Sequence, residues 1–373
     1  MINLLDIPDT VLSKGLPFAI YSLPNKTKFT LVVQKSSVVS EIDILDIEEK
    51  SGFVVSTFES ARTGISKIIK PDFLINEDDN LSDLNDFLSS IPEKPSKSTI
   101  DNISISKEDY LERANYLVNK LIDNELQKVV LSRVIKKHID REIKISSLIS
   151  LMRNKYKDAF INLFHIPGEG IWFGASPETL YKVIGDYVHT DALAGTKAID
   201  EQNPNPKWTI KEKEEQYMVS LFIESLLSEL GIKGYSLSGP ITANAGNIAH
   251  LQSIFKIPTL SLKNNEGKFI AGLHPTPAVC GLPKAEAFLL IQKAEQHQRR
   301  YYSGFLGPWN LDDNNQINTK TSELFVNLRC AEMANNTINL YVGGGLTASS
   351  VPEDEYQETV HKSNTLLSIV ENL

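Results

Sequence analysis

Residues 340–358 read LYVGGGLTASSVPEDEYQE and combine a strand, a glycine turn and the start of a helix. The alternating residues at the beginning predict the end of a strand. The three glycines would let a ligand approach the backbone and leave N–H groups free for an anion. Glu355 and Glu358 are three residues apart, so they would share a helix face. They would either stabilise the helix dipole or hold a metal beside an acidic ligand.

Outward from this stretch, predicted strands outnumber predicted helices. Short β-branched and aromatic runs predict strands at 18–22, 29–33, 52–56, 126–134, 160–165, 171–174, 178–183, 187–193, 236–238, 250–255, 305–309, 324–330 and 338–342. Apolar residues at helical spacing predict helices at 106–124, 141–155, 207–230, 284–297 and 353–370. Because many strands are at hairpin spacing, we expect an α/β protein of the α+β kind, with a largely antiparallel sheet covered by helices.

The chain has 373 residues, enough for two average domains or one large one. Residues 76–99 are polar and acidic, which predicts a surface connection that contains one short helix. We expect a single domain over residues 1–373. Residues 1–100 would supply outer strands without a catalytic motif, and residues 105–370 would carry the motifs.

The composition excludes several classes of protein. Hydrophobic residues make up 41% of the chain and charged residues 23%, as in a globular protein with a sizeable core. The net charge of -9 argues against a nucleic-acid or anionic-membrane surface. Two cysteines do not make a disulfide framework. Because the sequence shows neither a signal peptide nor an apolar run of membrane-spanning length, we expect a cytoplasmic protein.

Two isolated charged residues are candidates for acid–base chemistry. Lys128 lies within the apolar run of ELQKVVLSRV, where a buried ammonium would be costly and the neutral amine would be a usable base. The alternative is a lysine that faces solvent on an alternating strand. Glu178, in FGASPETL, is placed for acid–base work if its surroundings are dry, or is an ordinary turn acid.

A second pair of carboxylates lies in the first half of the long helix expected at 207–230. Glu212 and Glu215 are three residues apart, as are Glu355 and Glu358. Two such pairs on different helices would make an all-oxygen site that suits Mg²⁺ and does not suit zinc. The alternative is a solvated charged helix face.

Three further segments could contact a ligand. Gly195 and Thr196 lie in LAGTK, a turn of small residues that could bring amides and a hydroxyl to a ligand. His274 heads the stiff, proline-rich segment HPTPAVCGLP and would contact a ligand or hydrogen-bond locally. Arg329, expected on an apolar strand, would need either a substrate carboxylate or an internal glutamate.

Taken together and in order, these motifs resemble the chorismate-utilising enzymes, and within that family the isochorismate synthase branch. The motifs are QKVVLSR, GASPETL, LAGTK, LHPTPAVCG, YYSGFLG, LRCAEM, GGGLTASS and EYQET. The resemblance covers roughly residues 105–370 and is weak over the first hundred. It implies a single domain, a two-layer antiparallel β-sandwich with helices outside, and a buried Mg²⁺ site.

The resemblance also implies a role for each matching residue. Lys128 matches the base that activates water, and Glu178 matches the acid that protonates the leaving hydroxyl. The positions that match metal ligands are Glu215 and Glu358, with Glu212 and Glu355 as their partners. The positions that match substrate contacts are Arg329, Gly343, Gly345 and Lys362 for the carboxylates, and Gly195, Thr196 and His274 elsewhere.

The implied reaction is the Mg²⁺-dependent conversion of chorismate to isochorismate, an isomerisation that feeds either menaquinone or siderophore synthesis. Family members that add ammonia generally lack the lysine and work with a glutaminase partner. Lys128 therefore indicates water as the nucleophile, without a glutaminase subunit, and the resemblance implies a monomer. The same motifs also fit salicylate synthase, which goes on to eliminate pyruvate from isochorismate. A silent binding protein would not need to keep these buried charges.

Overall fold

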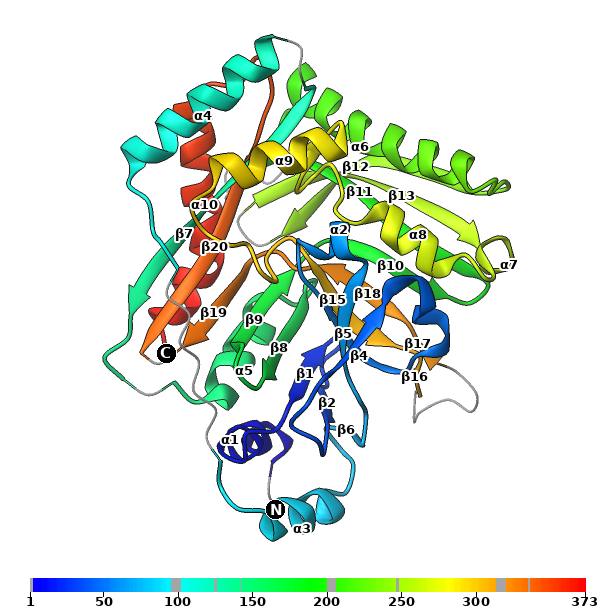
Figure 1. The fold of residues 1–373 in the computed structure, drawn as a ribbon, viewed down its shortest axis with the longest axis vertical. Coiled ribbons are helices and arrows are strands. Elements are labelled where there is room, and N and C mark those ends of the chain that lie inside the picture. The colour runs from blue at the N-terminus through cyan, green and yellow to red at the C-terminus, as the bar shows by residue number, and fades with distance from the viewer. Residues whose placement is uncertain are drawn as a thin grey trace.

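The computed structural model describes residues 3–94, 102–123, 126–141, 143–199, 206–245, 248–312, 320–334 and 336–373. Within these ranges two nine-stranded sheets form, and all the strand pairs between neighbours are antiparallel. One hydrophobic core draws residues from both sheets, so the sheets pack face to face with helices outside (Figure 1). This is the antiparallel sandwich that the sequence resemblance implied.

Each of the two large sheets has nine strands in a defined order. The first sheet has the order β14 (Gly281–Leu282), β7 (Lys128–His138), β20 (Thr337–Leu346), β19 (Cys330–Ala334), β9 (Gly170–Ser176), β8 (Phe160–Ile166), β1 (Phe18–Ser22), β2 (Thr30–Val33), β6 (Phe73–Asn76). The second has the order β12 (Ser236–Ala245), β13 (Ile248–Pro258), β11 (Tyr187–Ala198), β10 (Thr179–Ile184), β18 (Glu323–Val326), β15 (Phe305–Trp309), β4 (Gly52–Ser56), β5 (Ile65–Ile69), β3 (Ser40–Asp43). A short ribbon pairs β16 (Leu311–Asp312) with β17 (Lys320–Thr321).

Three long helices position the polar residues discussed below. Helix α6 (Ile210–Glu229) packs on β11 and β13, while α10 (Pro352–Val370) packs on β20 and on α4 (Lys107–Ile122) (Figure 1). The remaining helices are α1 (Ile7–Ser13), α2 (Ser60–Thr63), α3 (Ser82–Ser90), α5 (Ile145–Lys155), α7 (Thr259–Leu262), α8 (Glu266–Leu273), α9 (Lys284–Ala294) and the 3₁₀ turns η1 (Leu4–Asp6) and η2 (Ile44–Glu49). No helix in the described ranges is both long and apolar enough to cross a bilayer.

The first hundred residues contribute to both layers. Strands β1, β2 and β6 complete one end of the first sheet, and β4, β5 and β3 complete one end of the second. These are the outer strands that we expected from this part of the chain. The short helix expected between residues 76 and 99 is α3.

Alternation along β7 explains how a lysine enters the interior. Successive side chains of a strand point to opposite faces. Val129 and Leu131 therefore pack against α4 and α9, in a separate apolar cluster. Lys128 and Val130 point the other way and line a polar pocket. The alternative of a solvent-facing lysine is wrong, because Lys128 is 0% exposed.

Two predictions about the last third of the chain need correction. The three glycines do not form a loop, because β20 continues through them and pairs Gly343 with Ser132 and Gly345 with Val130. Strand pairing across the sheet therefore overrides the turn signal of a glycine run. The strand expected at 324–330 is interrupted, and Arg329 lies between β18 and β19 with φ of 48°.

Candidate active site

A small polar pocket lies where β7, β11 and β20 meet the helices α6 and α10. Its volume is about 50 Å³. Most of the predicted site residues line it, and these are Lys128, Glu178, Gly195, Thr196, Glu215, Arg329, Gly343, Gly345, Glu358 and Lys362. The structure thus brings together residues that are up to 234 positions apart in the sequence, from Lys128 to Lys362.

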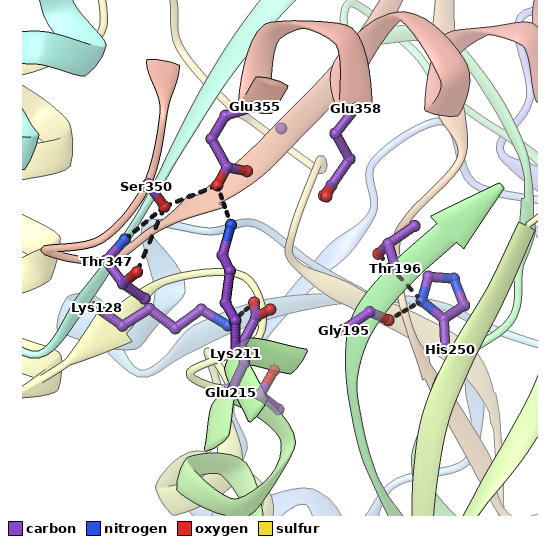
Figure 2. Close-up of polar contacts among 12 residues, drawn as sticks. Lys128, Gly195, Thr196, Lys211, Glu215, His250, Thr347, Ser350, Glu355 and Glu358 are labelled. Carbon is purple, nitrogen blue, oxygen red and sulfur yellow. Dashed lines mark hydrogen bonds and ion pairs between the residues drawn. The ribbon is translucent and has the colours of Figure 1, made fainter. Parts of the chain in front are cut away.

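The amine of Lys128 is paired with a carboxylate of α6. Lys128 Nζ lies 2.6 Å from Glu215 Oε1 (Figure 2). Burial raises the pKa of Glu215, but the nearby Lys128, with Lys362 and Lys211, outweighs burial and holds the pKa below its ordinary value. Gly345 makes this pair possible, because a Cβ there would lie 2.8 Å from Glu215 Oε1 and 3.0 Å from Lys128 Cε.

We expect Gly345→Ala to destabilise the protein by about 1–3 kcal/mol, because the added methyl overpacks the Lys128–Glu215 pair. Gly344→Ala is the matched control on the same strand. Its nearest neighbour, the Glu355 carbonyl oxygen, would be 3.3 Å away, so the loss should be smaller. Urea unfolding of both variants measures the difference, and equal losses would show that the methyl at 345 is accommodated.

The carboxyl of Glu178 lies in an enclosed position just before β10. It is 1% exposed, and Oε1 accepts a 3.3 Å hydrogen bond from Thr276 Oγ1. Burial raises the pKa of Glu178 to about 8, with a further contribution from the charge of Asp191. Thr276, Lys128 and Arg329 oppose this rise. Near neutral pH the group is therefore mainly protonated and can give up a proton.

Asp191 is a second buried carboxyl that the sequence interpretation missed. It lies on β11, and its Oδ2 accepts a 3.1 Å hydrogen bond from the backbone N–H of Thr179, the residue after Glu178. Burial raises the pKa of Asp191 to about 6 against the hydrogen bonds of Thr179 and Gln252 and the charge of Lys182. Asp191 thus fixes the backbone beside Glu178 and favours the protonated form of Glu178.

His250, also missed, connects Arg329 with the LAGTK segment. This segment is a bulged part of β11 and not the turn expected from the sequence, because it pairs with β13. Its Nδ1 lies 2.9 Å from the Gly195 carbonyl and 3.3 Å from Thr196 Oγ1 (Figure 2). Burial lowers the pKa of His250 to about 3, and the charge of Arg329 adds to this effect. The neutral ring therefore donates from Nδ1 to Gly195, which leaves Nε2 as an acceptor 3.3 Å from Arg329 Nη2.

The position of His274 does not match its expected role as a substrate contact. It lies at the end of α8, outside the polar pocket, with Nε2 3.0 Å from the Thr57 carbonyl. Burial lowers the pKa of His274 to about 3, and the charge of Lys284 contributes. The local hydrogen-bonding alternative therefore describes His274, and the histidine at the pocket is His250.

The four glutamates divide into different roles. Glu215 and Glu358 line the pocket, and Glu358 pairs with Lys362 at 2.6 Å. Glu355 is 3% exposed and is not among the lining residues of the pocket. Its Oε1 accepts hydrogen bonds from Lys211 and from Ser350, each at 2.7 Å (Figure 2).

Glu212 does not join this group of carboxylates. Its Oε2 accepts a 2.8 Å hydrogen bond from the Thr209 N–H and completes a capping box at the start of α6. The spacing Thr-x-x-Glu, which is the sequence signature of such a box, could have revealed this role.

The chemistry of these side chains fits a cation. Burial lowers the pKa of Lys211, yet carboxylates outweigh it and the pKa is above its ordinary value. The carboxylates responsible are Glu355, Glu215 and Glu358. Oxygen donors on two helices thus act together on one positive charge, as they would on Mg²⁺. In the described ranges no three His, Cys, Asp or Glu side chains are close enough to ligate a metal, and lysines pair with Glu215, Glu355 and Glu358.

The fold and the pocket define a β-sandwich protein with a buried amine, a buried acid and an arginine around one small polar pocket. A family model described as chorismate binding enzyme matches residues 11–371, and the chain belongs to this family. Over 272 residues it is 28% identical to the vibriobactin-specific isochorismate synthase of Vibrio cholerae, with 71% of this chain and 67% of the relative covered.

Other relatives agree with this family. The isochorismate synthase MenF of Escherichia coli strain K12 is 28% identical, with 67% of this chain and 57% of that protein covered. The matched segment therefore spans about two thirds or less of these relatives' lengths. A crystal structure from Bacillus anthracis, described as a 2,3-dihydroxybenzoate-specific isochorismate synthase, superposes with a TM-score of 0.78 at 23% identity and covers 98% of this chain and 99% of that chain. That similarity shows the shared fold.

Proposed function

We propose that this protein is an isochorismate synthase, an isomerase that converts chorismate to isochorismate. The observation that carries the proposal is that Lys128, protonated Glu178 and Arg329 line one pocket. The names of the relatives support the same reaction. They include a vibriobactin-specific enzyme and MenF, so siderophore and menaquinone synthesis are both represented among them.

Chorismate carries two carboxylates and a ring hydroxyl, and the pocket offers a cationic contact for each carboxylate. Arg329, oriented by His250, would bind one carboxylate. Lys362 would bind the other beside Gly343, whose carbonyl accepts a 3.0 Å hydrogen bond from Lys362 Nζ. Gly195 and Thr196 would contact the rest of the ligand, since both line the same pocket.

Acid and base would act at different ring positions. The amine of Lys128 would take a proton from water as the oxygen attacks the ring carbon beside the carboxylate-bearing carbon. The ring double bonds shift, and the 4-hydroxyl leaves with the proton of Glu178 as water. One water is added and one is lost, so the product is an isomer of the substrate.

Magnesium is part of this proposal. Glu215 and Glu358 would hold the ion, with Glu355 beside them, since the first two line the pocket and all three act on the positive charge of Lys211. A bound Mg²⁺ would neutralise the substrate carboxylate near the glycines of β20. Glu212 has no part in this set, since its carboxylate caps α6.

The decisive experiment is to incubate the purified protein with chorismate, with and without Mg²⁺, and to separate the products by chromatography. Isochorismate in equilibrium with chorismate, formed only with Mg²⁺, is the expected result. Salicylate together with pyruvate would identify the protein as a salicylate synthase instead. Chorismate that stays unchanged in every condition would overturn the proposal.

We further propose a cytoplasmic monomer that needs no glutaminase subunit, since water is the nucleophile.

Asp191→Asn should move the pH dependence of turnover in a defined direction. Glu178 acts while protonated, so activity falls as the pH rises through its pKa of about 8. Removing the negative charge of Asp191 lowers that pKa, and the alkaline limb of kcat/KM should move to lower pH. Asp186→Asn, an exposed change in the same hairpin, is the control. An unchanged limb in Asp191→Asn would contradict the coupling between the two carboxyls.

A further inference from the structure

A larger cavity lies directly beside the polar pocket. Pockets that enclose a whole organic ligand measure about 300–1,000 Å³, whereas the polar pocket holds only about 50 Å³. The neighbouring cavity, here named the vestibule, measures about 370 Å³. Both cavities are lined by Pro177, Leu193, His250 and Arg329, so they adjoin at these four residues. Ligand-sized space near the acid–base pair therefore lies in the vestibule.

The vestibule connects this meeting point with the protein surface. One wall is formed by the end of α5 and the segment that follows it, where Lys155, Lys157 and Asp158 line the cavity and are exposed. The inner end is lined by Leu193 and His250, which are 5% and 6% exposed. A solute that enters between the exposed side chains would reach Arg329, which lines both cavities.

The charges at the outer end have the opposite sign to the protein as a whole. Two lysines and one aspartate line it, and Arg329 adds a positive charge at the inner end. The whole chain has a net charge of -9, which repels an anion at long range. A local positive opening counteracts that repulsion and raises the concentration of anions at the site.

Lys155 is held beside the opening by two contacts. Its Nζ lies 2.6 Å from Ser368 Oγ of α10 and 5.7 Å from the centre of the Tyr156 ring. Tyr156 is itself fixed, because its hydroxyl donates a 2.7 Å hydrogen bond to the Thr365 carbonyl. The positive charge thus stays at the wall of the vestibule.

We propose that the vestibule is the entrance through which a dicarboxylate substrate reaches the pocket, and that Lys155 and Lys157 attract it. This inference rests on the proposed function, since the charge of chorismate is what the lysines would recognise. Arg329 then accepts one carboxylate where the two cavities meet.

The test compares two doubly substituted proteins. Lys155→Glu with Lys157→Glu should raise the KM for chorismate about tenfold at low salt with kcat unchanged, and the difference should shrink at high salt. Lys263→Glu with Lys268→Glu makes the same change in charge at exposed positions on α8 and before it, outside the vestibule, and should leave KM as in the wild type. Equal KM values in both double variants would overturn the proposal.

A second variant tests the route without changing charge. Ala243 lines the vestibule from the edge strand β12, opposite His250 in the strand ladder. Ala243→Trp should narrow the vestibule and lower kcat/KM at every salt concentration. An unaltered kcat/KM in a folded Ala243→Trp protein would show that substrate enters elsewhere.

Calorimetric titration with chorismate keeps the two proposals distinguishable. Chorismate binding that weakens in the Lys155/Lys157 variant supports the entrance even if the wild type makes no isochorismate. Turnover by the wild type with unchanged binding in that variant supports the function and rejects the entrance. A wild type that neither binds nor converts chorismate would reject both.

Discussion

Lys128→Ala is expected to reduce kcat for chorismate conversion by about 10²–10⁴-fold, the contribution of a positioned base. The amine is buried and lines the same pocket as Glu178 and Arg329. Among the described residues of β7, Lys128 is the lysine that lines this pocket. Steady-state kinetics with product separation measures the loss. Intact turnover in Lys128→Ala would remove the base from the mechanism.

The alanine change also leaves Glu215 without its 2.6 Å partner, so a loss of stability must be separated from a loss of chemistry. Lys128→Arg is the variant that does so. A guanidinium keeps the positive charge beside Glu215 but stays protonated, so it cannot act as a base. We expect Lys128→Arg to be folded and inactive. Lys137→Ala, an exposed change further along the same strand, should be fully active.

Glu178→Gln is expected to lower kcat by about 10²–10⁴-fold, since the amide cannot donate a proton to the leaving hydroxyl. The amide oxygen can still accept the hydrogen bond from Thr276, so the local structure should persist. Residual activity should lack the alkaline limb near pH 8 that Glu178 gives the wild type. A retained limb would assign that limb to another group.

Stability provides a second readout for Glu178. Its folded-state pKa is raised by burial, so deprotonation disfavours the folded state, and the wild type loses stability as the pH rises toward about 8. Glu178→Gln carries no such charge and should lose less stability as the pH rises from 4.5, the ordinary pKa of a glutamate, to about 8. Glu286→Gln, at an exposed position on α9, should follow the wild type. Parallel stability curves for wild type and Glu178→Gln would contradict a buried, neutral Glu178.

The sequence was most informative where a residue contradicts its local surroundings. Lys128 interrupts an apolar run, and the structure places its side chain in the interior, where it lines the polar pocket. The same reasoning applied to His250, a polar residue in an apolar strand, would have favoured it over His274. The prediction of a ligand contact for His274 came from its proline-rich neighbours, but the stiffness of a loop does not determine which cavity the loop faces.

Features that depend on distant partners could not be read from local patterns. The glycines 343–345 have every local property of a turn, yet β7 pairs with them across the sheet. Their use becomes clear only with Lys128 and Glu215 beside them. The expected pairing of Glu212 with Glu215 failed for a different reason, because the first turn of α6 needs a cap and Glu212 supplies it.

The order of strands has a consequence for how the protein is made. Strand β4 pairs with β15, so Gly52 finds its partner only when Trp309 has been synthesised. At about 5–20 residues per second, ribosomes would leave that strand edge unpaired for on the order of ten seconds or more. The pocket is completed at a later point of synthesis, because Glu358 and Lys362 of α10 line it. A nascent chain therefore exposes unpaired strand edges, which are prone to aggregation, until the partner strands have been synthesised. We expect the yield of active protein to depend on the supply of chaperones.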